Sequence, residues 1–179
     1  MDNIQLKAGI VGLGRWGQIL AKSINEQHSS FLKFTHCFTR TIEKVKTFCN
    51  KYDLTICNSY EKLINNNDID LIVLATPHTQ HYEQIIKAAN AKKHIFVEKP
   101  FTLTVKDAVK AFDCAKKNET KIGAGFNRRF LPSFNYFKDL SNQTSFGNKL
   151  HIEGNFSGPF GYDYNKDMWR GSLIENPSG

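Results

Sequence analysis

The chain has 179 residues, of which 40% are hydrophobic and 23% charged, a composition typical of soluble globular proteins. This composition excludes collagen-like and low-complexity chains, and no apolar run approaches the ~20 residues of a transmembrane helix. Lysine and arginine outnumber aspartate and glutamate by 24 to 17, which leaves a formal net charge of +7.

The excess positive charge comes mostly from lysines that are spread along helix-like segments rather than clustered. Nucleic-acid-binding surfaces depend strongly on arginine, so we expect a solvated lysine surface and no nucleic-acid partner. The amino terminus lacks the basic flank and apolar stretch of a signal peptide, and we expect a cytoplasmic protein without a membrane partner. The 4 cysteines lack the paired spacing of zinc or redox motifs, so we expect them to be reduced and structural.

Apolar runs alternate with segments of helical periodicity up to about residue 125. Strands are expected over residues 5–11, 31–38, 71–75, 95–97 and 121–125. Helices are expected over residues 15–27, 41–51, 59–65 and 79–91, and in the segment that follows Thr104. The continuous apolar run at 71–75 is typical of a parallel strand that is buried on both faces. The alternation predicts an α/β fold with a doubly wound parallel sheet and right-handed crossovers.

The carboxyl-terminal part of the sequence has a different composition, because it is rich in aromatic residues. A helix is expected over 132–140. Apolar and polar residues alternate over 149–157, which is typical of a strand with one solvent-exposed face. We therefore expect a first domain over residues 1–125 and an incomplete second α/β domain over residues 126–179.

A G-x-G-x-x-G motif at residues 12–17 follows the first expected strand and opens the first expected helix. In this context Gly12 allows a tight turn, Gly14 allows the backbone to approach a pyrophosphate, and Gly17 allows close helix–strand packing. The helix amino terminus adds N–H groups and a positive dipole end. The motif predicts a dinucleotide-binding Rossmann domain; the alternative is a helix-opening turn that binds nothing. The candidate cofactor contacts here are Gly12, Gly14, Arg15, Trp16 and Gly17.

The end of the second expected strand normally carries an acid that binds the adenosine ribose. Thr39 and Arg40 stand there instead, and no acid occurs before Glu43. A hydroxyl and a guanidinium would hold a 2′-phosphate that a carboxylate would repel, so we expect NADP in preference to NAD. Two alternatives remain open: Arg40 stacks on the adenine, or Glu43 turns back to the ribose.

Three polar segments each follow an expected strand of the sheet. They are Thr76-Pro77-His78-Thr79-Gln80-His81, Glu98-Lys99-Pro100 and Gly125-Phe126-Asn127-Arg128-Arg129-Phe130. Open α/β sheets bind their ligands at the carboxyl ends of the strands, so we expect these segments to line one cleft with the glycine turn.

In order and spacing, these four motifs resemble the glucose–fructose oxidoreductase/inositol dehydrogenase/rhizopine catabolism family (Gfo/Idh/MocA). The resemblance covers essentially the whole chain. It implies an NAD(P)-dependent oxidoreductase that transfers hydride between a nicotinamide cofactor and the hydroxyl or carbonyl of a sugar or cyclitol. It also implies a homo-oligomer.

The resemblance also implies roles for individual residues. Lys99 would be the catalytic lysine at the substrate hydroxyl, and Glu98 would position the cofactor ribose. The candidate cofactor contacts on this side are Thr76, Pro77, His78, His81, Glu98, Lys99, Asn127, Arg128, Trp169 and Arg170. Lys99 could instead be an exposed lysine before a turn proline. His78 and His81 could form a metal pair, but no cysteine or further carboxylate joins them, so no metal is expected.

One family motif has no counterpart in this sequence. Relatives carry an Asp-x-x-x-His or similar motif after the Trp-Arg segment, whereas only residues 171–179 follow Arg170 here. The alternative prediction is therefore a catalytically inactive dinucleotide-binding fragment, or one half of a split enzyme. Because an incomplete second domain would leave apolar surface uncovered, we expect self-association through residues 126–179.

Overall fold

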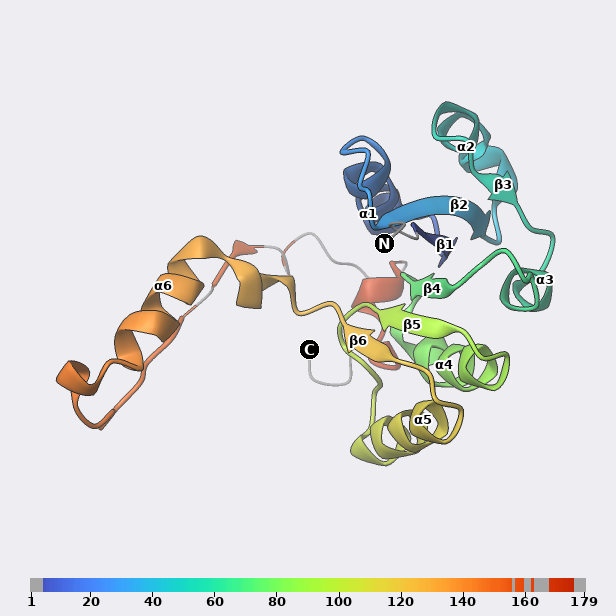
Figure 1. Ribbon diagram of the computed structural model, residues 1–179. Helices are drawn as coiled ribbons and strands as arrows, with labels where there is room; N and C mark the ends of the chain where they lie inside the picture. Colours follow the sequence, from blue (N-terminus) through green and yellow to red (C-terminus); the bar gives the residue numbers. More distant parts are fainter. Residues whose placement is uncertain (1–4, 156, 160–161, 163–167, 176–179) are drawn as a thin grey trace.

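A computed structural model describes residues 5–155, 157–159, 162 and 168–175 of the chain. Within these residues, parallel strands form a six-stranded sheet in the order β3-β2-β1-β4-β5-β6 (Figure 1). The strands are β1 (Leu6–Val11), β2 (Leu32–Phe38), β3 (Thr55–Ile56), β4 (Leu71–Leu74), β5 (His94–Val97) and β6 (Ile122–Ala124). The winding direction reverses between β1 and β4, so this order confirms the predicted doubly wound Rossmann fold.

Helices connect the strands and cover both faces of the sheet (Figure 1). The α-helices are α1 (Arg15–Asn25), α2 (Lys46–Lys51), α3 (Tyr60–Ile64), α4 (His81–Asn90), α5 (Val105–Lys117) and α6 (Pro132–Ser141). Short 3-10 helices are η1 (Ile42–Lys44), η2 (His78–Gln80), η3 (Asn127–Phe130), η4 (Thr144–Phe146) and η6 (Trp169–Gly171). The Thr104 side chain caps α5 by accepting a hydrogen bond from the Asp107 amide, at 3.1 Å.

Alternate residues of the central strands enter two separate cores. In β4, Ile72 and Leu74 pack with α3, α4 and α5, whereas Val73 packs with α1 and α2. All three side chains are buried, as expected for a continuous apolar run covered on both faces. In β1, Ala8 and Ile10 belong to the core on the α1 and α2 side.

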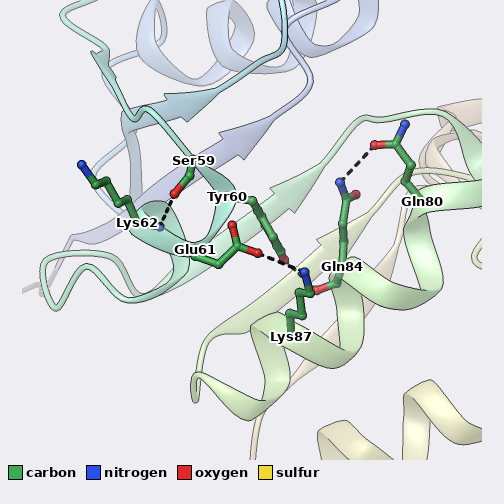
Figure 2. Close-up of polar contacts among 7 residues, drawn as sticks. All are labelled: Ser59, Tyr60, Glu61, Lys62, Gln80, Gln84 and Lys87. Atoms are coloured by element: carbon green, nitrogen blue, oxygen red, sulfur yellow. Dashed lines mark hydrogen bonds and ion pairs between the residues drawn. The ribbon is translucent and has the colours of Figure 1, made fainter.

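Polar contacts join α3 to α4 on one face of the sheet (Figure 2). The Tyr60 hydroxyl donates to the Gln84 carbonyl oxygen at 2.6 Å, and Lys87 forms an ion pair with Glu61 at 3.0 Å. Burial raises the pKa of the Tyr60 hydroxyl, so this group remains a donor at neutral pH. The Gln84 side chain also accepts a hydrogen bond from the Thr76 hydroxyl at 2.6 Å, which links this helix pair to the end of β4.

Three elements differ from the sequence-based prediction in the first domain. The helix expected over 79–91 begins as the 3-10 helix η2 and continues as α4 from His81. The single helix expected over 41–51 is divided into η1 and α2 at Val45. The two-residue strand β3 was not expected, because its length gives no readable periodicity. It forms by pairing Thr55 and Ile56 with His36 and Cys37 of β2.

The cysteine thiols are all free, and two of them face each other in the core on the α1 and α2 side. The sulfur atoms of Cys37 and Cys49 lie 3.6 Å apart. Burial raises the pKa of both thiols, which keeps them protonated and unreactive at neutral pH.

The carboxyl-terminal part contains the expected helix α6 but lacks an expected strand. In Figure 1, α6 stands away from the sheet, and its aromatic side chains are exposed. The prediction of a strand over 149–157 is wrong for residues 149–155 and 157, which form no strand. A strand needs a neighbour to pair its backbone groups, and no strand of the described part of the chain lies beside this segment. No helix among the described residues is long and apolar enough to cross a bilayer.

Candidate functional site

The glycine turn lies at the carboxyl end of β1, where the winding of the sheet reverses. Gly12 has a φ of +89°, and a Cβ there would lie 2.6 Å from the Ala75 carbonyl oxygen. A Cβ on Gly17 would overlap the Gly12 carbonyl oxygen. These two glycines are therefore required by the backbone of the turn and by the close approach of α1 to β1.

Gly14 differs from the other two glycines of the turn. Its φ of −67° suits any residue, and a Cβ built there has no atom within 4 Å. The fold of the turn therefore does not require glycine at this position, and the space beside it is open. A glycine in open space at a helix start is suited to a ligand that approaches the backbone closely.

The amino terminus of α1 has the properties of an anion site. No side chain caps it, and its first turn carries no acid. The first turn includes the exposed residues Arg15 and Trp16. Unsatisfied N–H groups, the positive end of the helix dipole and the open space at Gly14 fit a pyrophosphate group.

The end of β2 lies beside the glycine turn, because the Gly12 amide donates to the Phe38 carbonyl oxygen at 2.9 Å. This contact places Thr39 and Arg40 at the same edge of the sheet. Thr39 is half-buried and Arg40 is exposed. Glu43, the alternative ribose ligand, is in an ion pair with Lys46 at 2.7 Å.

The segment after β4 contains one accessible histidine and one buried histidine. Thr76, Pro77 and His78 are partly exposed, but His81 has no exposed surface. The His81 ring nitrogens lie 3.0 Å from the Thr76 carbonyl oxygen and 2.8 Å from the Pro100 carbonyl oxygen. The His81 ring is therefore unable to line an open cleft, and it instead connects the loops that follow β4 and β5.

The segment after β5 places its acid inward and its lysine outward. Glu98 is only 9% exposed, and one carboxylate oxygen accepts from the Lys99 amide at 3.3 Å. A Cβ on Gly125 would lie 2.7 Å from the other Glu98 oxygen, so the carboxylate packs against the backbone that follows β6. Lys99 is exposed, and the Lys99–Pro100 peptide bond is cis.

The segment after β6 and the carboxyl-terminal segment reach the same edge. Asn127 and Arg128 are exposed in η3. The Trp169 ring in η6 meets the His78 ring edge-on, with centroids 5.1 Å apart. Arg170 belongs to η6, but its side chain lies outside the described part of the structure.

One residue at this edge, Glu175, was not recognised from the sequence. The Glu175 carboxylate accepts hydrogen bonds from the amide and the hydroxyl of Thr79, at 3.0 and 2.6 Å. The Glu175 carbonyl oxygen accepts from Nδ1 of His78 at 2.7 Å. No motif or spacing signals a contact between residues so far apart in sequence. In the described residues, no three His, Cys, Asp or Glu side chains gather as a metal site would require.

The doubly wound sheet, the glycine turn at the winding reversal and the uncapped helix terminus define a dinucleotide-binding α/β domain. Comparison with known families extends this assignment, since residues 6–126 match the oxidoreductase family Gfo/Idh/MocA, described as an NAD-binding Rossmann fold. The chain belongs to this family, and its Rossmann domain is an NAD(P)-binding oxidoreductase domain.

Curated relatives include oxidoreductases and inositol dehydrogenases. The chain is 31% identical over 137 residues to the uncharacterised oxidoreductase YrbE of Bacillus subtilis, covering 76% of this chain and 40% of YrbE. It is 26% identical over 152 residues to an inositol 2-dehydrogenase of Salmonella typhimurium, covering 83% of this chain and 45% of that enzyme. The chain thus spans less than half the length of these relatives.

Solved structures that are similar to this chain are also oxidoreductases, and the chain again covers half of their length or less. A proposed NADPH-dependent oxidoreductase from Desulfitobacterium hafniense matches 98% of this chain and 50% of its own, with a TM-score of 0.89 and 28% identity. The scyllo-inositol dehydrogenase of Lactobacillus casei, solved with NAD(H) and scyllo-inositol, matches 81% of this chain and 43% of its own, with a TM-score of 0.75 and 28% identity.

Proposed function

We propose that this chain supplies the cofactor-binding half of an oxidoreductase that transfers hydride between a nicotinamide cofactor and a sugar or cyclitol. The observation that carries the proposal is the open space at Gly14, beside an α1 terminus with no side-chain cap. The inositol dehydrogenases among the relatives support the substrate class. We place the boundary between the cofactor domain and the second domain at residues 125 and 126.

The proposed roles follow from the position of each motif at the edge of the sheet. The turn at Gly12, Gly14 and Gly17 holds the pyrophosphate, with Arg15 and Trp16 at its side. The partly exposed side of Thr76, Pro77 and His78 contacts the nicotinamide half, together with Asn127, Arg128, Trp169 and Arg170. Glu98 positions the ribose. The buried His81 ring does not contact the cofactor and instead supports the loops that follow β4 and β5.

Lys99 is the proposed catalytic residue. The nicotinamide ring accepts or supplies the hydride when the cofactor is bound. Lys99 projects from the loop after β5 beside the buried Glu98, and its ammonium group would donate a proton to the substrate oxygen or, when deprotonated, remove one. A positioned acid–base group of this kind contributes roughly 10²–10⁴-fold in rate.

The pyrophosphate site is tested by the variant Gly14→Ala. The added methyl group meets no protein atom, so the melting temperature should not change, but it occupies the space that the cofactor needs. We expect the affinity for NADPH to fall about tenfold, equivalent to ~1.4 kcal/mol, in a titration of nicotinamide fluorescence. Gly154→Ala is the matched control, because Gly154 is equally open and lies far along the chain. Equal affinity of the Gly14→Ala and Gly154→Ala variants would remove the basis for the proposed function.

The choice of cofactor is tested by the variant Arg40→Ala. We propose that Thr39 and Arg40 bind the 2′-phosphate, so the wild-type chain should bind NADPH more tightly than NADH. Arg40→Ala should weaken NADPH binding about tenfold or more, because a hydrogen bond to a charged group contributes ~1.5–3 kcal/mol, and should leave NADH binding unchanged. Lys44→Ala, an exposed cation of η1, is the control. Tighter binding of NADH than of NADPH by the wild type would contradict the NADP preference.

A further inference from the structure

Within the described residues, the carboxyl-terminal segment returns to the edge of the sheet and contacts the loop that follows β4. Glu175 contacts Thr79 with both carboxylate oxygens and contacts His78 with its backbone carbonyl oxygen. Trp169 in the same segment meets the His78 ring edge-on. One short segment thus contacts both the backbone and the side chains of the loop that follows β4.

The Glu175 carboxylate supplies a helix cap that the local sequence does not provide. Thr79 lies in η2, which runs directly into α4, and neither Pro77 nor Gln80 makes a side-chain cap at these two helix starts. A carboxylate that accepts from a first-turn N–H satisfies an otherwise unpaired donor and lies at the positive end of the helix dipole. The Thr79 hydroxyl donates to the second oxygen, which fixes the carboxylate in one orientation.

The Glu175 carbonyl oxygen determines how the His78 ring is protonated. A carbonyl oxygen only accepts hydrogen bonds, so the contact of 2.7 Å requires a proton on Nδ1 of His78. In the neutral ring, Nε2 is then the acceptor nitrogen. The edge contact with Trp169 at 5.1 Å and the contact with His81 at 5.8 Å further restrict the orientation of the His78 ring.

We propose that Glu175 is a positioning residue of the cofactor cleft. It docks the segment 168–175 onto Thr79 and thereby fixes the His78 ring and Trp169 at the nicotinamide end. This inference rests on the proposed function, because it assigns the His78 loop to the nicotinamide half of the site. Glu175 acts through His78 and Trp169 and has no contact with the substrate in this assignment.

The test combines a spectroscopic and a binding measurement on the 179-residue chain. Long-range ¹H–¹⁵N correlation spectra report which nitrogen of His78 carries the proton, with His78→Gln used to assign the signals. Nicotinamide fluorescence gives the affinity for NADPH. The variants are Glu175→Ala, Glu175→Gln, which keeps one acceptor oxygen, and Thr79→Val, which removes the hydroxyl donor but keeps the amide. Glu153→Gln, another exposed acid of the carboxyl-terminal part, is the control.

We expect the wild type and Glu153→Gln to carry the His78 proton on Nδ1. In Glu175→Ala the segment should undock, the Nδ1–H signal should be lost, and NADPH binding should weaken roughly fivefold, the factor equivalent to ~1 kcal/mol. Glu175→Gln and Thr79→Val should show intermediate changes in both measurements.

Each departure from this result has a separate meaning. An unchanged His78 proton position in Glu175→Ala overturns the proposed contact. A changed proton position with unchanged NADPH affinity overturns the positioning role, because the segment then docks without affecting the cofactor. Failure of the wild type to bind NADPH or NADH overturns the proposed function, and the His78 spectrum still decides whether Glu175 docks the segment.

Discussion

At the scale of single residues, His81 is a polar side chain that is enclosed at the carboxyl edge of the sheet. Its ring is fully buried, and its two nitrogens face the carbonyl oxygens of Thr76 and Pro100. Burial lowers the pKa of His81, while the two carbonyl oxygens act in the opposite direction and offset part of this effect. A neutral His81 ring has one N–H group and therefore donates to one of these two carbonyl oxygens, while the ring lies between the loop after β4 and the loop after β5.

The lowered pKa of His81 predicts that acid destabilises the protein. As the pH falls below the ordinary histidine pKa of 6.5, the unfolded chain binds a proton before the folded chain does, so the free energy of unfolding decreases. The slope is at most about 1.4 kcal/mol per pH unit for one proton. Urea unfolding at pH 7.5, 6.5 and 5.5 should show this decrease, and His81→Asn, which keeps a donor but does not titrate, should reduce it.

The pKa of a second histidine, His36, is also lowered, so the His81→Asn variant should remove only part of the pH dependence of the free energy of unfolding. Burial lowers the pKa of His36, with Asp68 acting against this effect and Lys7 with it. An identical pH dependence in the wild type and His81→Asn would show that His81 is not buried in its neutral form.

At the scale of elements, the connection from α3 to β4 depends on a buried lysine from the start of β5. Lys93 is 9% exposed, and its ammonium group donates to the carbonyl oxygens of Asn66 and Ile69 at 2.8 and 2.7 Å. Burial lowers the pKa of Lys93, with Asp70 acting in the opposite direction. The ammonium group thus binds two backbone acceptors of the turn between α3 and β4, in addition to the hydrogen bond that the Ile69 amide donates to the Asn66 carbonyl oxygen at 3.2 Å.

Replacement of Lys93 by methionine should therefore destabilise the fold. The variant keeps the apolar stem but removes the Lys93 donor from the Ile69 carbonyl oxygen and one of the two donors from the Asn66 carbonyl oxygen, which still accepts from the Ile69 amide at 3.2 Å; the cost is about 1–3 kcal/mol. Thermal unfolding should show a decrease of several degrees, at roughly 2–4 °C per kcal/mol for a chain of this size. Lys92→Met changes the exposed neighbour and should have little effect. Equal melting temperatures for the two variants would contradict a structural role for Lys93.

At the scale of the whole molecule, the two parts of the chain differ in how they bury apolar residues. The sheet and helices α1 to α5 enclose two cores, whereas large apolar side chains of η3 and α6 remain exposed. These exposed side chains are Phe130, Leu131, Phe134, Tyr136, Phe137 and Leu140. Exposed apolar side chains that are concentrated in one short stretch of the chain favour association with another apolar surface.

The isolated 179-residue chain should therefore self-associate through the η3 and α6 surface. Light scattering should give a mass above that of the monomer, and the double variant Phe130→Ser/Phe137→Ser should shift the mass toward 20.4 kDa. Phe112→Ser is the control, because Phe112 is exposed on α5, on the other part of the chain. A monomeric wild type, or an equal effect of the control, would contradict association through α6.

Local sequence patterns were sufficient to predict most of the fold. The apolar run at 71–75, the helix after Thr104 and the glycine turn at 12–17 are all confirmed, because periodicity, capping and glycine spacing are short-range properties. The division of the helix over 41–51, the strand β3 and the absence of a strand at residues 149–155 and 157 were not predicted. The two strand outcomes depend on whether a pairing strand is present elsewhere in the chain, and a local pattern does not contain that information.

The sequence by itself determined the fold class, the family and the edge of the sheet at which the candidate site lies. The tertiary structure decided which side chains of the motifs are accessible. It buried His81 under the loops, left Lys99 exposed and brought Glu175 to Thr79, 96 positions away in the chain. The physical reason is that burial and long-range hydrogen bonds depend on how the chain packs, whereas motif spacing depends only on neighbours in sequence.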